Sequence, residues 1–502
     1  MKKRNYLKKL IIQNRLFLIM LSIMMIIIVG AFLKPDEFKM MSNFLFSLIT
    51  EKFGWLYLLG MFLFVIFIIW IGISKYGDIV LGDENTKPEH STFSWLAMLF
   101  CAGMGVGLVF WGLSEPLSHY SNPMNGIEAY SAESAAFSFK MSFMHWGLHP
   151  WAAYAVVGLS LAYFQFKKKK KSLISETINV KKKFIKGMID GLAIFATIAG
   201  VVTSLGLGVL QINRGLEYLF GMPDNINVQI GIILIISLVF ILSAVSGVNR
   251  GVKLLSDINV IVALIVLIIC FCVANKINVL NNLIQGIGGY LYGFAKDSLN
   301  ISAYSDNSWI YNWHVFYWAW WIAWAPFVGG FIAKISKGRS VREFIWGVVF
   351  VPTMASVIWF SVMGTLGIDL GQNGILQIEQ INAIASNPEL GLFEVLFYYP
   401  MGKIISGIVI ILLICFFVTS ADSGTLVLAT MTSDGNETPS NKKKIIWGII
   451  QASFAIALLV ASGLKALQTI SIVAAFPFIF VMFAQCVELI KEFNIDKSKE
   501  IY

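Results

Sequence analysis

Charged residues are scarce in this sequence. Asp, Glu, Lys and Arg make up 13% of its 502 residues, whereas a soluble globular domain carries about a quarter. This scarcity excludes a soluble protein. The five cysteines all lie in apolar runs, where they behave as small buried residues and imply neither a disulfide framework nor a metal site; they are Cys101, Cys270, Cys272, Cys415 and Cys486.

Long polar segments and catalytic motifs are also missing. The loops between apolar runs are too short for a soluble catalytic or regulatory domain. The apolar runs contain no nucleophile elbow, metal cluster or pair of catalytic acids, which argues against a membrane enzyme. The first apolar run is long and lacks a small-residue cleavage site, so it predicts a retained helix and not a signal peptide.

Apolar residues are abundant instead, at 57% of the chain. Runs of about 18 residues or more, each able to cross a hydrocarbon core of roughly 30 Å, recur along it. We therefore expect an all-α polytopic membrane protein. Twelve spans are predicted, at 14–33, 54–74, 93–113, 135–164, 188–211, 227–246, 256–275, 310–334, 344–367, 402–430, 444–462 and 468–491.

The net charge of +9 is concentrated in particular loops, which favours a membrane topology signal over nucleic-acid binding. Basic residues gather on one predicted side, at Lys2, Lys3, Arg4, Lys8, Lys9, 167–171, 181–183, Arg250, Lys253, Lys334, Lys337, Arg339, Arg342 and 442–444. Acidic residues mark the other side, at Glu115, Glu128, Glu133, Asp224, Asp369, Glu379 and Glu389. The positive-inside rule then places both termini in the cytoplasm.

Tryptophan is concentrated in the eighth span, in the string WHVFYWAWWIAWAPF. On a helix, five rings share a sector of roughly 100° and Trp318 lies off it; the five are Trp313, Tyr317, Trp320, Trp321 and Trp324. An interfacial aromatic belt is one explanation. The stripe runs three turns deep, so we favour a binding face for a quaternary ammonium group, which aromatic ring faces hold well.

The third span contains closely spaced glycines in the string CAGMGVGLVFWG. Glycine weakens a helix by up to about 1 kcal/mol per residue relative to alanine. The glycines either allow tight helix packing or mark an unwound segment, whose free amides and carbonyls face a ligand; we expect the helix to break. Glu115 follows near the end of this run and is interpreted as a solvated or capping residue close to the outer surface.

The fourth span carries a second aromatic group, Trp146, Trp151 and Tyr154, around Pro150. Their spread of about 140° on an ideal helix could complete a box. His145 and His149 lie one turn apart in the same span. They predict hydrogen bonds to a neighbouring helix, with a proton relay as the alternative, and Lys140 predicts a snorkelling side chain.

The tenth span is interrupted by polar residues in the string CFFVTSADSGT. Thr419 and Ser420 supply neutral oxygens of the kind that sodium prefers, although such hydroxyls often bond back to their own helix. Asp422 is a candidate functional residue because an intramembrane carboxylate needs partners.

Four strings together resemble the betaine/choline/carnitine transporter family: GMGVGLVFWGLSEPLSHY, MHWGLHPWAAY, FYWAWWIAWAPFVGGFIAKISKGRSVREF and FFVTSADS. The resemblance implies the leucine-transporter type of fold, with two inverted five-helix repeats after two peripheral helices, and commonly a trimer. The expected organisation is a basic cytoplasmic N-terminus (1–13), peripheral helices and loops (14–92), a first repeat (93–275), a connecting segment that could form an amphipathic helix (276–309), a second repeat (310–491) and a short cytoplasmic tail (492–502).

The resemblance also implies a site. The aromatic box falls on Trp146, Trp151, Tyr154 and Trp321, with Trp320 and Trp324 guarding the path. The substrate carboxylate would approach the backbone of the glycine segment, at Gly103, Met104, Gly105 and Gly107. A sodium ion would bind carbonyls of Cys101, Met104 and Phe416 and the hydroxyls of Thr419 and Ser420. A second sodium site, at Thr197 and Phe327, lacks a second threonine because Val201 stands there.

The function expected is import of glycine betaine, or a related trimethylammonium zwitterion, by sodium symport with alternating access. No other cofactor is implied, and the partners expected are the substrate, membrane lipids and two further copies of the chain. Gly107 stands where proton-coupled choline carriers of the family tend to have aspartate, which favours betaine. The alternatives are a choline or carnitine transporter, proton-coupled or a sodium-independent exchanger, and, from another class, a receptor for quaternary amines.

Overall fold

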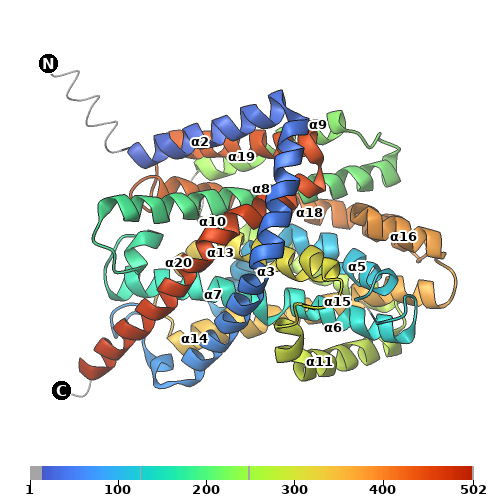
Figure 1. Ribbon diagram of the computed structural model, residues 1–502, viewed down its shortest axis with the longest axis horizontal. Coiled ribbons are helices and arrows are strands. Elements are labelled where there is room, and N and C mark those ends of the chain that lie inside the picture. The colour runs from blue at the N-terminus through green and yellow to red at the C-terminus, as the bar shows by residue number, and fades with distance from the viewer. Residues whose placement is uncertain (1–13, 125, 247–248, 500–502) are drawn as a thin grey trace.

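The computed structural model describes residues 14–124, 126–246 and 249–499 (Figure 1). The basic segment 1–13 and residues 500–502 of the predicted tail lie outside the described residues. Throughout the described part the regular elements are helices, and the β-type pairing found there is one bridge between Val80 and Ser340. The predicted all-α class is confirmed.

The longer helices account for most of the chain. They are α2 (Arg15–Leu33), α3 (Pro35–Ile73), α4 (Thr92–Gly103), α5 (Gly105–Ser121), α6 (Ala132–Trp146), α7 (Leu148–Ala162), α8 (Lys183–Phe220), α9 (Ile226–Ser246), α10 (Asn249–Val273), α11 (Lys276–Ser298), α13 (Phe316–Ile335), α15 (Val351–Gln372), α18 (Gly402–Met431), α19 (Asn441–Ser462) and α20 (Leu464–Lys499). Shorter helices are α12 (Ser308–Ile310), α14 (Val341–Ile345), α16 (Ile378–Ser386) and α17 (Gly391–Leu396). Helix α11 occupies much of the connecting segment 276–309.

Membrane-spanning helices dominate the described residues. Ten helical segments are long and apolar enough to cross a membrane, or up to eleven when the bent pair α4 and α5 is taken as one span. The predicted span 135–164 is divided at Gly147 into α6 and α7, of 15 residues each. The count of twelve spans and the inverted repeat stay predictions.

The glycine-rich third span is broken, as its composition predicts. Helix α4 ends at Gly103, α5 begins at Gly105, and the two are bent by 65°. At such a break the last carbonyls of one helix and the first amides of the next have no partner within their helices. Met104 bridges the break, because its amide bonds to Phe100 O and its carbonyl accepts from Leu108 N, both at 3.0 Å.

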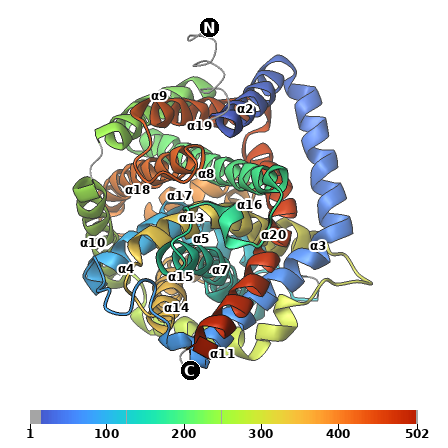
Figure 2. The same cartoon turned by 90° about the vertical axis from the view of Figure 1, so that its left-hand side faces the viewer.

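Burial separates a central group of helices from the periphery. In the most apolar part of each segment, 94% of residues are buried in Ser308–Ile335 and 89% in α8, against 28% in α2 and 22% in Leu255–Val273. Figure 2 shows α13 and α5 near the middle, with α2 and α19 side by side at the outside. The tryptophan-rich helix α13 is therefore enclosed by protein.

Candidate functional site: an aromatic cluster beside a broken helix

The four predicted box residues meet where α13 packs along α7. The ring centroids of Trp146 and Trp321 are 4.9 Å apart, those of Tyr154 and Trp321 6.3 Å, and those of Trp151 and Tyr154 5.6 Å. The three pairs meet edge to face, at 73°, 87° and 87°. Residues from three helices, α6, α7 and α13, thus form one continuous cluster of rings.

The flanking tryptophans of α13 continue this cluster. Trp320 stacks on Trp321 with centroids 4.8 Å apart, and Trp324 meets Trp320 edge to face at 6.3 Å. The exposed fractions of Trp320, Trp321 and Trp324 are 1%, 1% and 3%. This burial rules out the lipid-facing belt for these three rings. Trp318 lies off the face, as predicted, and stacks on His149 at 4.6 Å.

The polar atoms of the ring cluster fall into two groups. The indole N–H of Trp321 donates to the backbone carbonyl of His145 at 2.9 Å, and that of Trp146 donates to Glu115 at 2.6 Å. The N–H groups of Trp151, Trp320 and Trp324 and the hydroxyl of Tyr154 are buried and make no hydrogen bond within the described residues. The second group thus consists of buried donors without a partner in the described chain.

The glycine segment touches this cluster directly. A Cβ atom added to Gly103 would lie 2.6 Å from the ring of Trp151, and one added to Gly107 would lie 3.0 Å from Trp146 and 3.1 Å from Trp320. Side chains larger than hydrogen would displace the rings. Glycine is therefore required here by close approach of the backbone, and the freed amides of the break lie beside the aromatic cluster.

The sodium candidates lie on the other side of the break. A Cβ atom on Gly105 would lie 3.3 Å from Ser420 Oγ and 3.4 Å from Phe416, so α5 packs against α18 at the predicted residues. Ser420 Oγ is buried without a hydrogen bond among the residues described. Freed carbonyls of α4 and this hydroxyl are oxygens that suit a hard monovalent cation.

Thr419 is more occupied than Ser420. Its hydroxyl lies 3.0 Å from both Cys415 O and Phe416 O, which is the back-bonding expected for threonine in an apolar helix. Asn259 donates to the same oxygen at 3.3 Å. Cys101 contributes its thiol to Ser256 O at 3.5 Å, which leaves its own carbonyl at the end of α4. A cation here would compete with Asn259 for Thr419.

The weaker sodium candidate lies on α8 and α13. Thr197 Oγ1 is buried and makes no hydrogen bond within the described chain, and Phe327 contacts Trp324, with ring centroids 5.6 Å apart. A small cavity lies close by, lined by Val106, Val201, Ser204, Leu205, Trp324, Phe417 and Ser420. Val201 presents a methyl-bearing side chain to this cavity, so the second hydroxyl is absent at that position.

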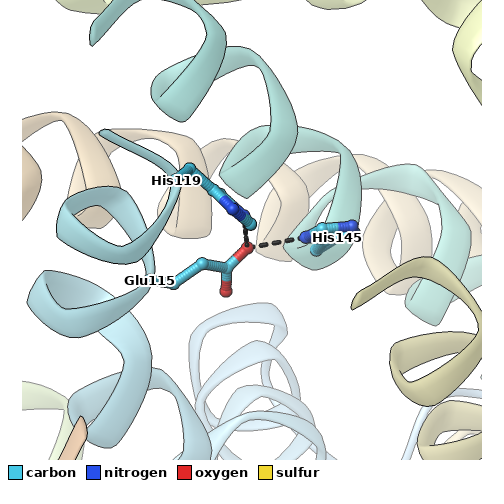
Figure 3. A group of neighbouring side chains, drawn as sticks. All are labelled: Glu115, His119 and His145. Carbon is cyan, nitrogen blue, oxygen red and sulfur yellow. Dashed lines mark hydrogen bonds and ion pairs between the residues drawn. The ribbon is translucent and has the colours of Figure 1, made fainter. Parts of the chain in front are cut away.

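The interpretation of Glu115 as a solvated or capping residue is wrong. Helix α5 continues through Pro116 to Ser121, and the exposed fraction of Glu115 is 0%. Its Oε1 lies 2.6 Å from His145 Nδ1 and 3.3 Å from His119 Nε2 (Figure 3). The sequence misled because a Ser-Glu-Pro string after an apolar run is typical of a helix end.

The second carboxylate oxygen of Glu115 faces the aromatic cluster. Oε2 accepts from the indole N–H of Trp146 at 2.6 Å and from the hydroxyl of Tyr317 at 2.5 Å. His145 Nε2 lies 2.6 Å from His314 Nδ1. Ligand atoms of Glu115, His119 and His145 lie within 4.8 Å of one another, which is a spacing that a metal ion could bridge. Each of them is already engaged in a hydrogen bond inside the trio, so we interpret it as a hydrogen-bonded network.

Three other polar residues singled out in the sequence have partners. His149 Nε2 lies 2.9 Å from Ser298 Oγ on α11, and His145 likewise bonds to neighbouring helices, as predicted. Lys140, expected to snorkel, forms an ion pair with Asp297 at 2.9 Å. Asp422 accepts from Ser243 Oγ of α9 at 2.5 Å, so its carboxylate braces α18 against α9.

The sequence reasoning missed the link between Glu115 and the box. One signal was available, because Glu115 and His119 are four residues apart and so share a helix face. Tyr317 lies in α13 and His314 just before it, so their contributions depend on how this segment packs against α5 and α6, and no local pattern reports that packing.

Comparison with known proteins gives consistent matches along the chain. Residues 15–498 match the family described as BCCT, betaine/carnitine/choline family transporter. An ectoine/hydroxyectoine transporter of Virgibacillus pantothenticus is 42% identical over 466 residues, which cover 92% of this chain and 92% of that protein. The glycine betaine transporter OpuD of Bacillus subtilis strain 168 is 40% identical over 493 residues, covering 97% and 95%. The osmo-dependent choline transporter BetT2 of Acinetobacter baylyi is 36% identical over 463 residues, covering 90% and 67%.

Proposed function

The chain belongs to the betaine/carnitine/choline family of transporters, and from this premise we propose that it imports glycine betaine, or a close trimethylammonium zwitterion, by sodium symport. Members of the family are transporters, so the enzyme and receptor hypotheses are set aside. The protein is a multi-pass membrane protein. Cytoplasmic placement of both termini, contacts with anionic lipid and a homotrimer remain parts of the proposal.

The observation that carries the proposal is the meeting of Trp146, Trp151, Tyr154 and Trp321 beside Gly103 and Gly107. A quaternary nitrogen has no proton to donate, so ring faces hold it by cation–π contacts of about 0.5–2 kcal/mol each. The amides freed at the helix break suit the carboxylate of a zwitterion. The two ends of glycine betaine thus find complementary groups on adjacent elements.

Sodium coupling is supported by the position of Ser420. Its unpaired hydroxyl lies against Gly105 at the start of α5, while the box rings lie against Gly103 and Gly107 of the same segment. A sodium ion bound there would hold the broken segment in the shape that binds substrate. By linkage, sodium then raises substrate affinity and substrate raises sodium affinity by the same factor.

The direct test is uptake of radiolabelled glycine betaine into proteoliposomes. We expect accumulation with an inward sodium gradient and none when potassium replaces sodium. Equal uptake in both salts would contradict sodium coupling and favour the exchanger.

Two tryptophan variants test the aromatic box in the same assay. Trp321→Leu should abolish uptake, whereas Trp318→Leu, which removes a buried indole outside the box, should retain it. Equal loss of uptake in both variants would contradict the box.

Ectoine is a second candidate substrate, favoured by the 42% identical ectoine/hydroxyectoine transporter. Ectoine is also a zwitterion, but its cation is a planar amidinium that carries N–H donors. Competition against labelled betaine by ectoine, choline and carnitine separates these candidates. A trimethylammonium site requires betaine to compete most strongly, and stronger competition by ectoine would assign the chain to that substrate.

A further inference from the structure

Glu115 is a buried carboxylate whose hydrogen-bonding capacity is filled. It accepts from four side chains, two at each oxygen: His145 and His119 at Oε1, Trp146 and Tyr317 at Oε2. An ionised carboxylate accepts at about four positions and donates at none. Four donors therefore compensate the desolvation of one negative charge, and this environment suits the ionised form.

The same carboxylate is linked to two histidine rings. His145 Nδ1 lies 2.6 Å from Glu115 Oε1, and His145 Nε2 lies 2.6 Å from His314 Nδ1. The rings of His145 and His314 therefore form one hydrogen-bonded chain that ends at Glu115.

Two of the four box rings are tied to this cluster, and the other two are not. Trp146 donates directly to Oε2, and Trp321 donates to the backbone carbonyl of His145, whose ring holds Oε1. The Trp151 N–H and the Tyr154 hydroxyl make no hydrogen bond within the part of the chain described. Glu115 therefore holds Trp146 directly, and Trp146 in turn meets Trp321 at 4.9 Å.

A carboxylate behind an indole also changes what the ring face offers. Hydrogen bonds to an ionised acceptor are roughly twice as strong as neutral ones, and the N–H···O⁻ bond draws the indole dipole so that the ring becomes richer in electrons. A ring richer in electrons favours a positive head group at the face of Trp146.

We propose that Glu115 is a positioning and specificity-determining residue that acts through the indole of Trp146 to orient the aromatic box and to select a cationic head group. This inference rests on the proposed function, since it concerns the head-group end of the same site. Four side chains occupy the acceptor positions of the carboxylate, so its effect reaches the ligand through Trp146.

A double-mutant cycle on purified protein tests the proposal, with glycine betaine binding measured by calorimetry in saturating sodium. Glu115→Gln keeps the shape and removes the charge, and Trp146→Phe keeps a ring and removes the N–H. Each change should raise Kd about tenfold, which is the weight of one charge-assisted hydrogen bond. If Glu115 acts through Trp146, the double variant should also lie near tenfold and not near the hundredfold expected of independent sites.

Trp151→Phe provides the matched control, because Trp151 belongs to the same box and its N–H is unpaired. The increase in Kd caused by Trp151→Phe should multiply with the increase caused by Glu115→Gln. If the increases in Kd also multiply when Glu115→Gln is combined with Trp146→Phe, the proposal is overturned. Failure of wild-type protein to bind betaine would overturn the proposed function instead, so the two failures are distinguishable.

A second measurement separates charge from orientation. The carbon isostere 3,3-dimethylbutanoate keeps the carboxylate and the three methyl groups of betaine and lacks the positive charge. We expect Glu115→Gln to narrow the preference for betaine over this isostere about tenfold; an equal loss for both compounds would reduce Glu115 to a structural role. Should Glu115→Gln fail to fold, Trp146→Phe should still weaken betaine more than Trp151→Phe does, and equal effects would refute the proposal.

Discussion

Two polar groups are buried in the centre of this transporter, and they differ in how completely they are satisfied. Around Glu115, both carboxylate oxygens receive two donors each. Around the small cavity beside α5, the hydroxyls of Ser204 and Ser420 are buried and make no hydrogen bond among the described residues. A filled network fixes the side chains that belong to it, whereas the oxygens that line the small cavity have no partner in the described chain and include Ser420, which we propose as a ligand of the cation.

The contrast assigns different roles to neighbouring parts of one site. The Glu115 network holds the indole N–H of Trp146 and, in our proposal, sets where that ring points. The hydroxyl of Ser420 lies against Gly105 at the start of α5, where we propose that sodium binds. Mutations should therefore separate the two groups, because loss of a filled partner lowers stability and loss of an unpaired hydroxyl lowers cation affinity.

The largest effect is expected for Glu115→Leu. Removing the carboxylate leaves four buried donors without partners, which should destabilise the protein by about 3–5 kcal/mol. Thermal unfolding in detergent measures this as a lower Tm together with loss of betaine binding. A Tm like that of wild type would show that the network contributes no stability and that the Glu115 network does not differ from the unpaired hydroxyls in this respect.

The combined change Thr419→Ala and Ser420→Ala should affect sodium before it affects folding. Loss of two oxygen ligands should raise the sodium concentration for half-maximal uptake at least about tenfold, equivalent to about 1.4 kcal/mol. Uptake measured over a series of sodium concentrations checks this, with Tm as the control. Unaltered sodium activation would show that these two hydroxyls do not bind the cation.

Two milder substitutions compare the Glu115 network with the unpaired hydroxyls in one experiment. Tyr317→Phe removes one donor from Glu115 Oε2 and should lower stability by about 1–2 kcal/mol. Ser204→Ala removes a hydroxyl that bonds to no described residue and should change stability by less than about 0.5 kcal/mol. Equal Tm shifts in the two variants would mean that burial alone, and not hydrogen bonding, distinguishes the groups.

The smallest effect is expected for Thr197→Val. A lone hydroxyl with Val201 one helical turn away is a poor site for a second ion, so sodium activation should be unchanged and should follow a single-site curve. Sodium titration of uptake measures both quantities. A sigmoidal curve that becomes hyperbolic in Thr197→Val would establish the second site instead.

Features that depend on local composition were predictable from the sequence. The density of Gly103, Gly105 and Gly107 predicted the break that the structure places at Met104, and helical periodicity placed Trp320, Trp321 and Trp324 on one face. Both follow from backbone propensity and from the 100° step of the helix. The convergence of these rings with Trp146 was expected from the family resemblance, since periodicity does not say which helices pack together.

Features that depend on tertiary packing were not predictable. The helix continues through Pro116, where Gly364 of α15 leaves room for the ring: a Cβ on Gly364 would lie 3.0 Å from Pro116 Cγ. Pro116 therefore does not end α5, and Glu115 becomes a mid-helix residue. The division of 135–164 at Gly147 was missed for a similar reason, because a single glycine in an apolar run does not announce a break.

The interruption at Gly147 has a mechanical consequence for the binding site. Trp146 is the last residue of α6, whereas Trp151 and Tyr154 belong to α7. The backbone at Gly147 has φ −95° and ψ −125°, and a Cβ there would lie 2.4 Å from Phe143 O. The rings of Trp146 and of the pair Trp151 and Tyr154 are therefore carried by two separate rods joined at Gly147, so the angle between these rods sets the width of the cage.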